Sequence, residues 1–285
     1  MALQVTEFGC GGIAIGLCIS HKVCDGTTIA SFLKAWSQKA MGEASSSPLN
    51  MEASFLFPHK GIEIDINDRL GEKNITTKRF LFSGNSLCKL KEEISRGCGF
   101  KPTRVEAVTT LIWKSALEAA RTTELSDKSS SFLLHVVNIR GRMQPPLPEN
   151  SLGNLFVPSI SPLFEVDKET KMELQDLVEV VRNTIKMVDG NYVRKLQGDG
   201  QELMETLEPM SQKFYLVAKK GVPCYGFSSW VRFGFYETNF GWGKPTWVCT
   251  IGVPIKNVII LMPACSGDGG LEAWITLNEL HMCQF

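Results

Sequence analysis

The sequence predicts an α/β protein with a mixed sheet and two layered domains. Short apolar runs typical of buried or half-buried strands, such as residues 13–19, alternate with segments whose apolar residues recur at helical spacing, such as residues 29–40. The chain has 285 residues, of which 44% are hydrophobic and 21% are charged. This composition is typical of a globular protein, and the length suffices for one large or two modest domains.

Charge and apolar patterning exclude several function classes. The 30 Lys and Arg residues balance the 30 Asp and Glu residues, so the basic excess that a nucleic-acid binder needs is missing. No apolar run reaches the roughly 18–20 residues that span a bilayer, and residues 1–12 show no secretory signal. The nine cysteines include no C-x-x-C pair, so we expect reduced thiols and neither a disulfide scaffold nor a zinc site. We therefore expect a cytoplasmic protein without a nucleic-acid or membrane partner.

The first elements form a strand, a turn and a helix. Residues 13–19 alternate large and small apolar side chains, residues 20–26 form the turn, and residues 29–40 have helical spacing. A Ser-rich stretch at 43–50 ends the helix. Residues 51–77 are weakly periodic and are expected to be a crossover linker.

The rest of the chain is expected to form a second α/β unit. We expect strands at 78–83, 132–139, 214–218, 227–233, 246–253, 258–262 and 273–280. We expect helices at 86–96, from 103 onward and at 174–188, with residues 189–191 ending the last of them. Residues 145–148 are expected to be a rigid extended segment, and residues 197–202 and 266–270 to be Gly-rich loops.

One constellation points to chemistry. His21, Asp25 and Gly26 form H-x-x-x-D-G at the exit of the first predicted strand, where a side chain can be held rigidly and yet stay exposed. A histidine with a pKa near 6.5 can take a proton from a hydroxyl or amine and return it to a leaving group, so we predict that His21 is a general base. A structural histidine at a turn is the alternative. A metal site built on His21 and Asp25 is disfavoured because no third ligand follows at a useful spacing.

Four motifs in the same order resemble those of the plant BAHD acyltransferases. They are the H-x-x-x-D-G motif, the segment 137–142 (VNIRGR) followed by 151–154 (SLGN), the segment 228–230 (SSW), and the segment 239–245 (NFGWGKP). They extend over nearly the whole chain, and the resemblance is nearest to the alkaloid-acetylating, vinorine synthase-like branch.

The resemblance implies a fold and an activity. The fold is the two-domain chloramphenicol acetyltransferase-like fold, with mixed β-sheets flanked by helices. The activity is transfer of an acyl group, expected to be acetyl, from an acyl-CoA thioester to a hydroxyl or amine of a plant specialised metabolite. The implied co-substrate is acetyl-CoA or another acyl-CoA, with no permanently bound cofactor, no metal and a monomeric state.

The resemblance also implies roles for residues around His21. Asp25 is expected to turn away from the channel and pair with Arg140, because an unpaired buried charge costs several kcal/mol. Gly26 is expected to permit the tight turn and to leave room for substrate. Trp230 and Ser228 are candidate donors to the oxyanion of the tetrahedral intermediate, with a core position as the alternative for Trp230.

Two further segments carry implied roles. Thr103 and Arg104 are expected near the coenzyme A entrance, although a capping box with Glu106 explains Thr103 equally well. The last motif departs from the family, because Asn239 replaces its first Asp and loses a charge. Its other residues should preserve the packing and the turn: Phe240, Gly241, Trp242 and Gly243.

The position of the first motif implies an incomplete first domain. Family members place H-x-x-x-D near mid-chain, whereas His21 lies near the start here. We therefore expect residues 1–50 to be a remnant of the N-terminal domain and residues 78–285 to be the C-terminal domain, with residues 239–262 packing against the first. Two interpretations stay open: an acyl-CoA-dependent O-acyltransferase, or a truncated relative that binds coenzyme A or a partner without turnover.

Overall fold

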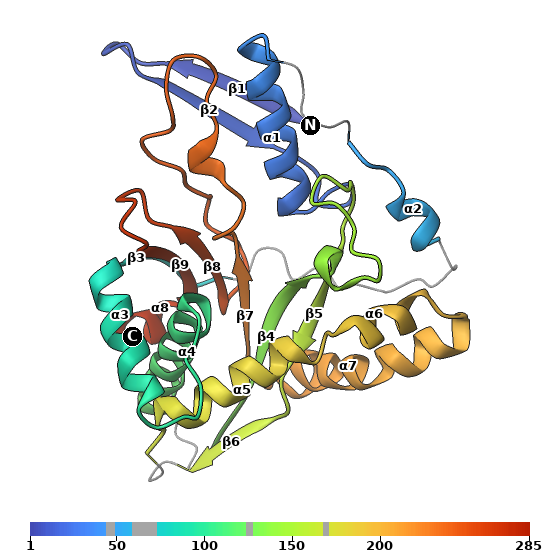
Figure 1. Ribbon diagram of the computed structural model, residues 1–285. Coiled ribbons are helices and arrows are strands. Elements are labelled where there is room, and N and C mark those ends of the chain that lie inside the picture. The colour runs from blue at the N-terminus through green and yellow to red at the C-terminus, as the bar shows by residue number, and fades with distance from the viewer. Residues whose placement is uncertain (44–48, 59–72, 124–127, 168–170) are drawn as a thin grey trace.

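The fold of the chain is seen in a computed structural model that describes residues 1–43, 49–58, 73–123, 128–167 and 171–285 (Figure 1). The strands are β1 (Ala2–Glu7), β2 (Ile13–Cys18), β3 (Ile75–Phe82), β4 (Lys128–Asn138), β5 (Phe156–Ile160), β6 (Phe164–Asp167), β7 (Cys224–Ser229), β8 (Val258–Pro263) and β9 (Leu271–Asn278). The α-helices are α1 (Gly26–Ala40), α2 (Ala53–Leu56), α3 (Gly84–Ser95), α4 (Arg104–Thr123), α5 (Leu174–Lys186), α6 (Gly190–Gln197), α7 (Gly200–Lys220) and α8 (Glu279–Gln284). Two 3₁₀ helices, η1 and η2, span Arg140–Arg142 and Phe235–Glu237.

A mixed sheet of seven strands forms the main layer. Its order is β3-β9-β8-β7-β4-β5, and β6 pairs with β4 beside this path. Strand β7 runs parallel to β4 and β8, whereas the remaining pairs are antiparallel. The α/β class with a mixed sheet is therefore confirmed.

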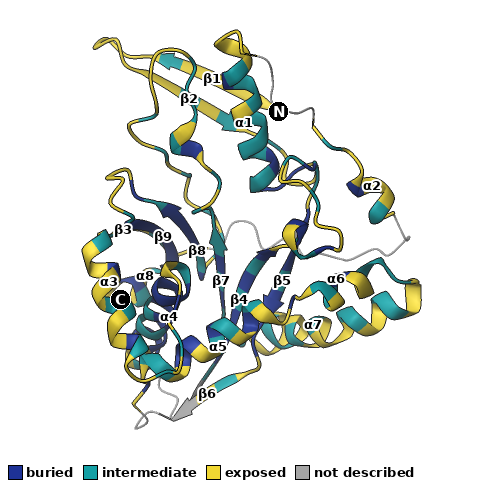
Figure 2. Cartoon of the chain, in the orientation of Figure 1, coloured by how far each residue is buried: buried dark blue, intermediate teal, exposed yellow. Residues whose placement is uncertain are grey.

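Helices cover one face of this sheet and enclose the main hydrophobic core. Trp113 of α4 packs there with Phe227 of β7 and Ile259 of β8, all fully buried. Figure 2 shows β8 and β9 mostly in dark blue and β7 partly in teal, with exposed residues on the outer sides of the helices. Each large side chain buried in this way contributes about 1.5–3 kcal/mol to folding. The core fixes β7 rigidly, and the candidate oxyanion donors lie at the end of β7.

The first residues form a smaller unit at one end of the sheet (Figure 1). Strands β1 and β2 pair as an antiparallel hairpin in which every residue is exposed or half-buried. Helix α1 follows, and Asp25 caps it by accepting a hydrogen bond from the backbone N–H of Thr28 at 2.9 Å. The expected strand–turn–helix order around His21 is present.

The long connection between β7 and β8 reaches back to α1. Phe240 packs on Trp36 of α1 with the ring centroids 4.6 Å apart, so this part of the connection contacts the first unit. The division of the chain at residues 50 and 78 stays a prediction. Within the expected linker, α2 and the start of β3 are described, while residues 59–72 lie outside the described part, as do residues 44–48 of the Ser-rich stretch.

Several expected elements are wrong or displaced. Residues 214–218 belong to α7 and are not a strand, because the helix that starts at the Asp199 cap continues through them. Residues 246–253 are mostly exposed and form no strand. The expected loop at 197–202 consists of the end of α6, a two-residue junction and the first turn of α7. Asp189 does not end a helix: it caps α6 by accepting a hydrogen bond from the N–H of Tyr192 at 2.8 Å.

Some elements were not expected from the sequence. They are β1, β5, β6, α2, α6, most of α7, and α8. Strand β5 is a sheet edge, and two features suit it to that place: Pro158 lies within it, and Lys213 of α7 donates a hydrogen bond to its Ile160 carbonyl at 2.8 Å. In the described part of the chain, even the long helices α4 and α7 are too polar to cross a membrane, and no other helix can do so.

Candidate active site

His21 lies in the turn between β2 and α1, with its side chain exposed. Its backbone carbonyl accepts a hydrogen bond from the side-chain amide of Asn154 at 2.7 Å. Its imidazole meets the ring of Phe156 edge-on, with the centroids 5.6 Å apart. One short segment, residues 154–156, therefore contacts both the backbone and the ring of His21.

Asp25 and Arg140 form a buried ion pair beneath this turn. The guanidinium donates from Nη1 to Oδ2 of Asp25 at 2.7 Å and from Nη2 to Oδ1 at 3.0 Å, and Arg140 is only 1% exposed. The carboxylate also accepts from the N–H groups of Thr28 and Leu155. Burial alone would raise the pKa of Asp25, but these hydrogen bonds outweigh burial and hold the pKa below its ordinary value. The structure thus directs the Asp25 carboxylate to Arg140, as the resemblance implies.

Arg140 also ties the turn to the loop at residues 151–153. Its Nε and Nη2 donate to the carbonyl of Ser151 at 3.1 and 2.8 Å, and Nη2 reaches the carbonyl of Gly153 at 3.2 Å. Asn138, at the end of β4, donates to the hydroxyl of Thr27 at 3.2 Å. The segment 138–155 is therefore hydrogen-bonded to the start of α1.

An aromatic ring occupies the space next to Gly26. A methyl group built on Gly26 would lie 2.8 Å from Cζ of Phe233 and closer still to its Cε2, which is nearer than real methyl contacts come. The space over Gly26 is thus taken by Phe233, and the expectation that it is left for substrate is wrong.

Ser228 lies near the end of β7, Trp230 directly follows this strand, and the two side chains contact each other. The indole Nε1–H of Trp230 donates to the Ser228 hydroxyl at 3.2 Å. The Trp230 backbone N–H donates to the Leu261 carbonyl at 2.7 Å, which anchors this segment to β8. Trp230 is half-buried and packs with Phe233 and Phe235, so it is not a fully buried core residue.

The segment 239–243 packs on α1 away from its first turn. Asn239 Oδ1 accepts hydrogen bonds from the N–H groups of Gly241 at 2.9 Å and Gly243 at 3.1 Å. Both glycines have positive φ angles, which favour glycine, and Phe240 stacks on Trp242. An amide oxygen is sufficient for these contacts, so the turn is formed although the carboxylate of the family motif is replaced.

Thr103 and Arg104 lie at the start of α4. Thr103 and Glu106 exchange hydrogen bonds, with the Thr103 N–H donating at 2.7 Å and its hydroxyl accepting at 3.1 Å, so the capping box is present. Arg104 donates to the carbonyl of Gly269. Next to it, Asp268 accepts from Ser266 and from the N–H groups of Gly84 and Gly270, which lowers the pKa of Asp268 to about 2. A role of Thr103 and Arg104 in coenzyme A binding stays a prediction.

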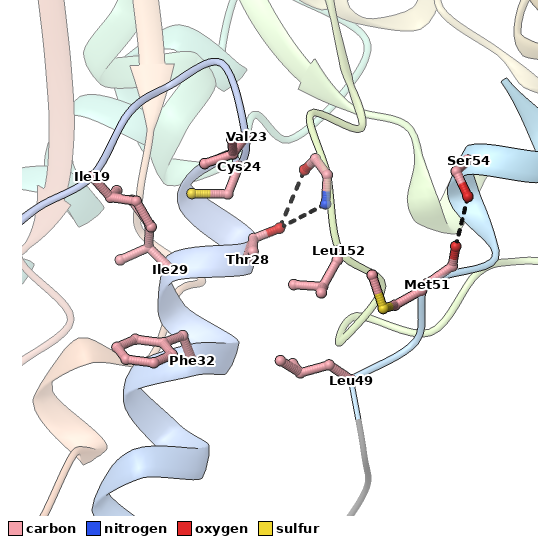
Figure 3. A pocket seen from close by; sticks show the side chains of 11 residues that line it. Ile19, Val23, Cys24, Thr28, Ile29, Phe32, Leu49, Met51, Ser54 and Leu152 are labelled. Atoms are coloured by element: carbon pink, nitrogen blue, oxygen red, sulfur yellow. Dashed lines mark hydrogen bonds between the residues drawn. The ribbon is translucent and has the colours of Figure 1, made fainter. Parts of the chain in front are cut away.

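An apolar hollow of 380 Å³ lies on another side of the same turn (Figure 3). It is lined by Ile19, Val23, Cys24, Thr28, Ile29, Phe32, Leu49, Met51, Ser54, Leu152 and Gly153. His21 is not part of this lining. Burial and the nearby Asp25 raise the pKa of the Cys24 thiol, so Cys24 is suited to packing and not to thiolate chemistry. The described residues include no group of three or more His, Cys, Asp or Glu side chains that could hold a metal.

Sequence reasoning missed three residues at this site. Asn154 belongs to the Ser-Leu-Gly-Asn segment, but that motif alone assigns no role to its amide. Phe156 follows two residues later, and its contact with His21 depends on the pairing of β5 with β4. Phe233 had no signal in the sequence, because its contact with Gly26 joins distant parts of the chain.

The mixed sheet and the H-x-x-x-D-G turn are the features that the family resemblance leads us to expect. A sequence model described as the Transferase family matches residues 1–285, and the chain therefore belongs to this family, the BAHD acyltransferases.

Curated relatives agree with this assignment. Akuammiline synthase 1 of Alstonia scholaris is 38% identical over 100% of this chain and 65% of its own length. Stemmadenine O-acetyltransferase of Catharanthus roseus is 34% identical over 99% of this chain and 63% of its own length. The chain thus spans about 65% of the length of the first of these relatives and 63% of the second.

Solved structures show the same fold. The crystal structure of vinorine synthase matches with a TM-score of 0.81 and 29% identity, over 99% of this chain and 63% of that one. F. graminearum TRI101 complexed with coenzyme A and T-2 mycotoxin matches with a TM-score of 0.76 over 99% of this chain and 66% of that one, but at 18% identity it shows the fold alone. The chloramphenicol acetyltransferase-like fold that the family implies is confirmed.

Proposed function

We propose that this protein transfers an acyl group from an acyl-CoA thioester to a hydroxyl or amine, with His21 as the general base. One observation carries the proposal: His21 is exposed at a strand-to-helix turn, and segment 154–156 contacts both its backbone and its ring. A general base works best when its geometry is fixed before substrate arrives. The ion pair of Asp25 with Arg140 supports the turn without engaging the imidazole.

The proton moves twice in this scheme. The imidazole of His21 accepts the proton of the acceptor hydroxyl or amine as its oxygen or nitrogen forms a bond to the thioester carbonyl carbon. The tetrahedral intermediate then collapses, the carbon–sulfur bond breaks, and the coenzyme A thiolate takes the proton back from the imidazolium. A positioned base of this kind contributes about 10²–10⁴ in rate.

Ser228 is the proposed direct donor to the oxyanion of the intermediate. Its oxygen accepts a hydrogen bond from the Trp230 indole, so its own hydroxyl hydrogen is directed elsewhere. Trp230 therefore acts behind Ser228 and polarises the hydroxyl, as linked hydrogen bonds strengthen each other. Loss of one oxyanion donor costs about 10²–10³ in rate.

The acyl group is proposed to be acetyl and the acceptor a plant specialised metabolite. Stemmadenine O-acetyltransferase and vinorine synthase are among the relatives at 34% and 32% identity, which supports an acetyl group, a hydroxyl acceptor and a place in alkaloid metabolism. No cysteine in the described part of the chain forms a disulfide, which supports a cytoplasmic location. We also propose that the protein acts as a monomer.

The test follows thiol release from acetyl-CoA in the presence of a panel of alcohols and amines. We expect release that depends on the acceptor and falls at least about 10²-fold in His21→Ala. His281→Ala is the matched control, because His281 is half-buried in α8, and it should leave the rate unchanged. Equal rates in His21→Ala and the parent chain would overturn the assignment of His21.

The second candidate is a chain that binds coenzyme A or a partner without turnover. Exposed apolar side chains beside the turn favour it: Val23 is 65% exposed, and Val5 on the hairpin is 59% exposed. Calorimetric titration with coenzyme A separates the two candidates. Binding without thiol release for any acceptor would support the second, and a single detectable turnover would exclude it.

A further inference from the structure

We propose that Phe233 is a positioning residue that sets the place of the Ser228–Trp230 strand end relative to the turn that carries His21. The contact between Phe233 and Gly26 joins the two segments that hold the proposed base and the proposed oxyanion donors. The kinetic consequence of this proposal rests on the proposed function. The packing itself does not, and it can be tested separately.

The ring of Phe233 is held from the side of β7. Its centroid lies 6.2 Å from that of Trp230 and 5.6 Å from that of Phe235, and the rings of Trp230 and Phe235 are 6.1 Å apart. The Phe233 backbone N–H donates to the carbonyl of Trp230 at 3.1 Å. Three mutually packed rings with a short backbone link restrict each other, so Phe233 cannot swing away at low cost.

The other side of the ring lies against the first residue of α1. Gly26 begins the first turn of the helix, and only the absence of a Cβ lets the ring approach its Cα so closely. The Asp25 carboxylate, paired with Arg140, fixes this end of the helix. The ring is therefore a spacer between two anchored segments, and a change of its size or of Gly26 should shift one segment relative to the other.

Because Gly26 lies at the start of a helix, the direction of the effect of Gly26→Ala on stability can be predicted. Ala is a better helix residue than Gly, so Gly26→Ala would be neutral or stabilising if the ring left room for a methyl group. Gly200 is the matched control because it is also the first residue of a helix, also follows an Asp cap, and has no atom within 4 Å of a built Cβ. The contrast between the two glycines isolates the effect of Phe233.

The experiment is a double-substitution cycle of Gly26→Ala and Phe233→Leu, because Leu lacks the Cε and Cζ atoms of the ring. We expect Gly26→Ala to lower the melting temperature by about 3 °C or more and Gly200→Ala to leave it unchanged or raised. In the Phe233→Leu background, Gly26→Ala should be neutral or stabilising. Strictly additive effects of the two substitutions would overturn the proposal.

Hydrogen–deuterium exchange measures the coupling without any need for activity. Gly26→Ala should speed exchange in the peptide covering 224–231, which is distant in sequence, and Phe233→Leu should restore protection in the double variant. Unchanged exchange at 224–231 in Gly26→Ala would overturn the proposal.

Thiol release from acetyl-CoA measures how the Gly26→Ala substitution affects the reaction. We expect kcat to fall about tenfold in Gly26→Ala with an unchanged KM for acetyl-CoA, and to recover in the double variant. If the stability and exchange measurements show the coupling but no chain, the parent included, releases thiol, the spacer role of Phe233 is supported. Only the proposed function is then contradicted.

Discussion

Arg140 and Asp25 meet in a two-pronged ion pair, with nitrogen–oxygen distances of 2.7 and 3.0 Å, below the turn that carries His21. The pair joins the cap of α1 to the end of β4, and Arg140 also donates to two carbonyls of the loop at 151–153. Removing Arg140 leaves the buried Asp25 carboxylate and the carbonyls of Ser151 and Gly153 without this donor. This pair thus supports the proposed base through the backbone, without contact to the imidazole.

Arg140→Met is expected to lower the free energy of unfolding by about 3–5 kcal/mol, because it strands the Asp25 carboxylate in a buried place. Urea denaturation followed by circular dichroism measures the change. The comparison variant is Lys171→Met, which removes an exposed partner of Glu173 and should leave the midpoint unchanged. A midpoint shift as small in Arg140→Met as in Lys171→Met would contradict the structural role.

His135 is expected to make the fold less stable in mild acid. It is 4% exposed, its Nε2 has no hydrogen-bond partner in the described part of the chain, and burial lowers its pKa to about 4. The folded pKa lies below the unfolded value near 6.5, so the folded state binds the proton less readily and stability falls as pH drops through this window. The free energy of unfolding should decrease by about 2 kcal/mol between pH 7 and pH 5.

The matched variant for this pH effect is His135→Leu, which cannot titrate. Its unfolding free energy should change between pH 7 and pH 5 by about 2 kcal/mol less than that of the parent chain. Glu106 and Arg142 are the charged groups that act on His135, with opposite effects on its pKa. Parallel pH profiles for the parent and His135→Leu would show that His135 is not responsible.

Asn154 is expected to matter for the rate of acyl transfer more than for folding. Its amide donates to the carbonyl of His21 at 2.7 Å, and both residues are exposed. Asn154→Asp cannot donate and sets a negative charge against that carbonyl, so thiol release should fall roughly tenfold with little change in melting temperature. Asn191→Asp is the control, because Asn191 accepts a hydrogen bond from Arg194 and an Asp can still do so. Equal rates of thiol release in the two Asp variants would rule out a role for the hydrogen bond from Asn154 to the His21 carbonyl.

Asn239 is expected to tolerate the charge of the family motif but not the loss of its side-chain oxygen. Asn239→Asp keeps the acceptor for Gly241 and Gly243 and should change the free energy of unfolding by less than about 0.5 kcal/mol. Asn239→Ala leaves both N–H groups without this acceptor and should cost about 1–2 kcal/mol. Thermal melting of both variants is the measurement, and a larger loss for Asp than for Ala would contradict this account.

The sequence alone could predict the elements around His21, because the alternation at 13–19 and the helical spacing at 29–40 are strong local patterns, and the structure has β2 at 13–18 and α1 at 26–40. It could not predict α7. This helix has no buried residue, so its apolar spacing is weak, and Phe214, Tyr215 and Val217 resemble strand residues when read locally. The prediction of a strand at 246–253 was wrong for another reason: its apolar residues are typical of a strand, but they pair with no strand in the described part of the chain and are mostly exposed.

The candidate site divides in the same way. The ion pair of Asp25 and Arg140 could be inferred from the family resemblance, since a buried carboxylate needs a partner. The contact of Gly26 with Phe233 could not, because nothing in local sequence indicates which ring reaches a glycine far away in the chain. The hydrogen bond from Trp230 to Ser228 also emerged only from the structure, since residues two positions apart in an extended segment point the same way but need not bond.

The central claim is that His21 is the base for acyl transfer, and single-turnover transfer of labelled acetyl from acetyl-CoA to an accepted alcohol tests it most directly. His21→Gln keeps a polar side chain of similar reach and removes the titrating imidazole. With equal coenzyme A affinity and equal melting temperature in both proteins, we expect transfer to slow by about 10²–10⁴ in His21→Gln. Transfer at the parent rate in that variant would contradict the claim.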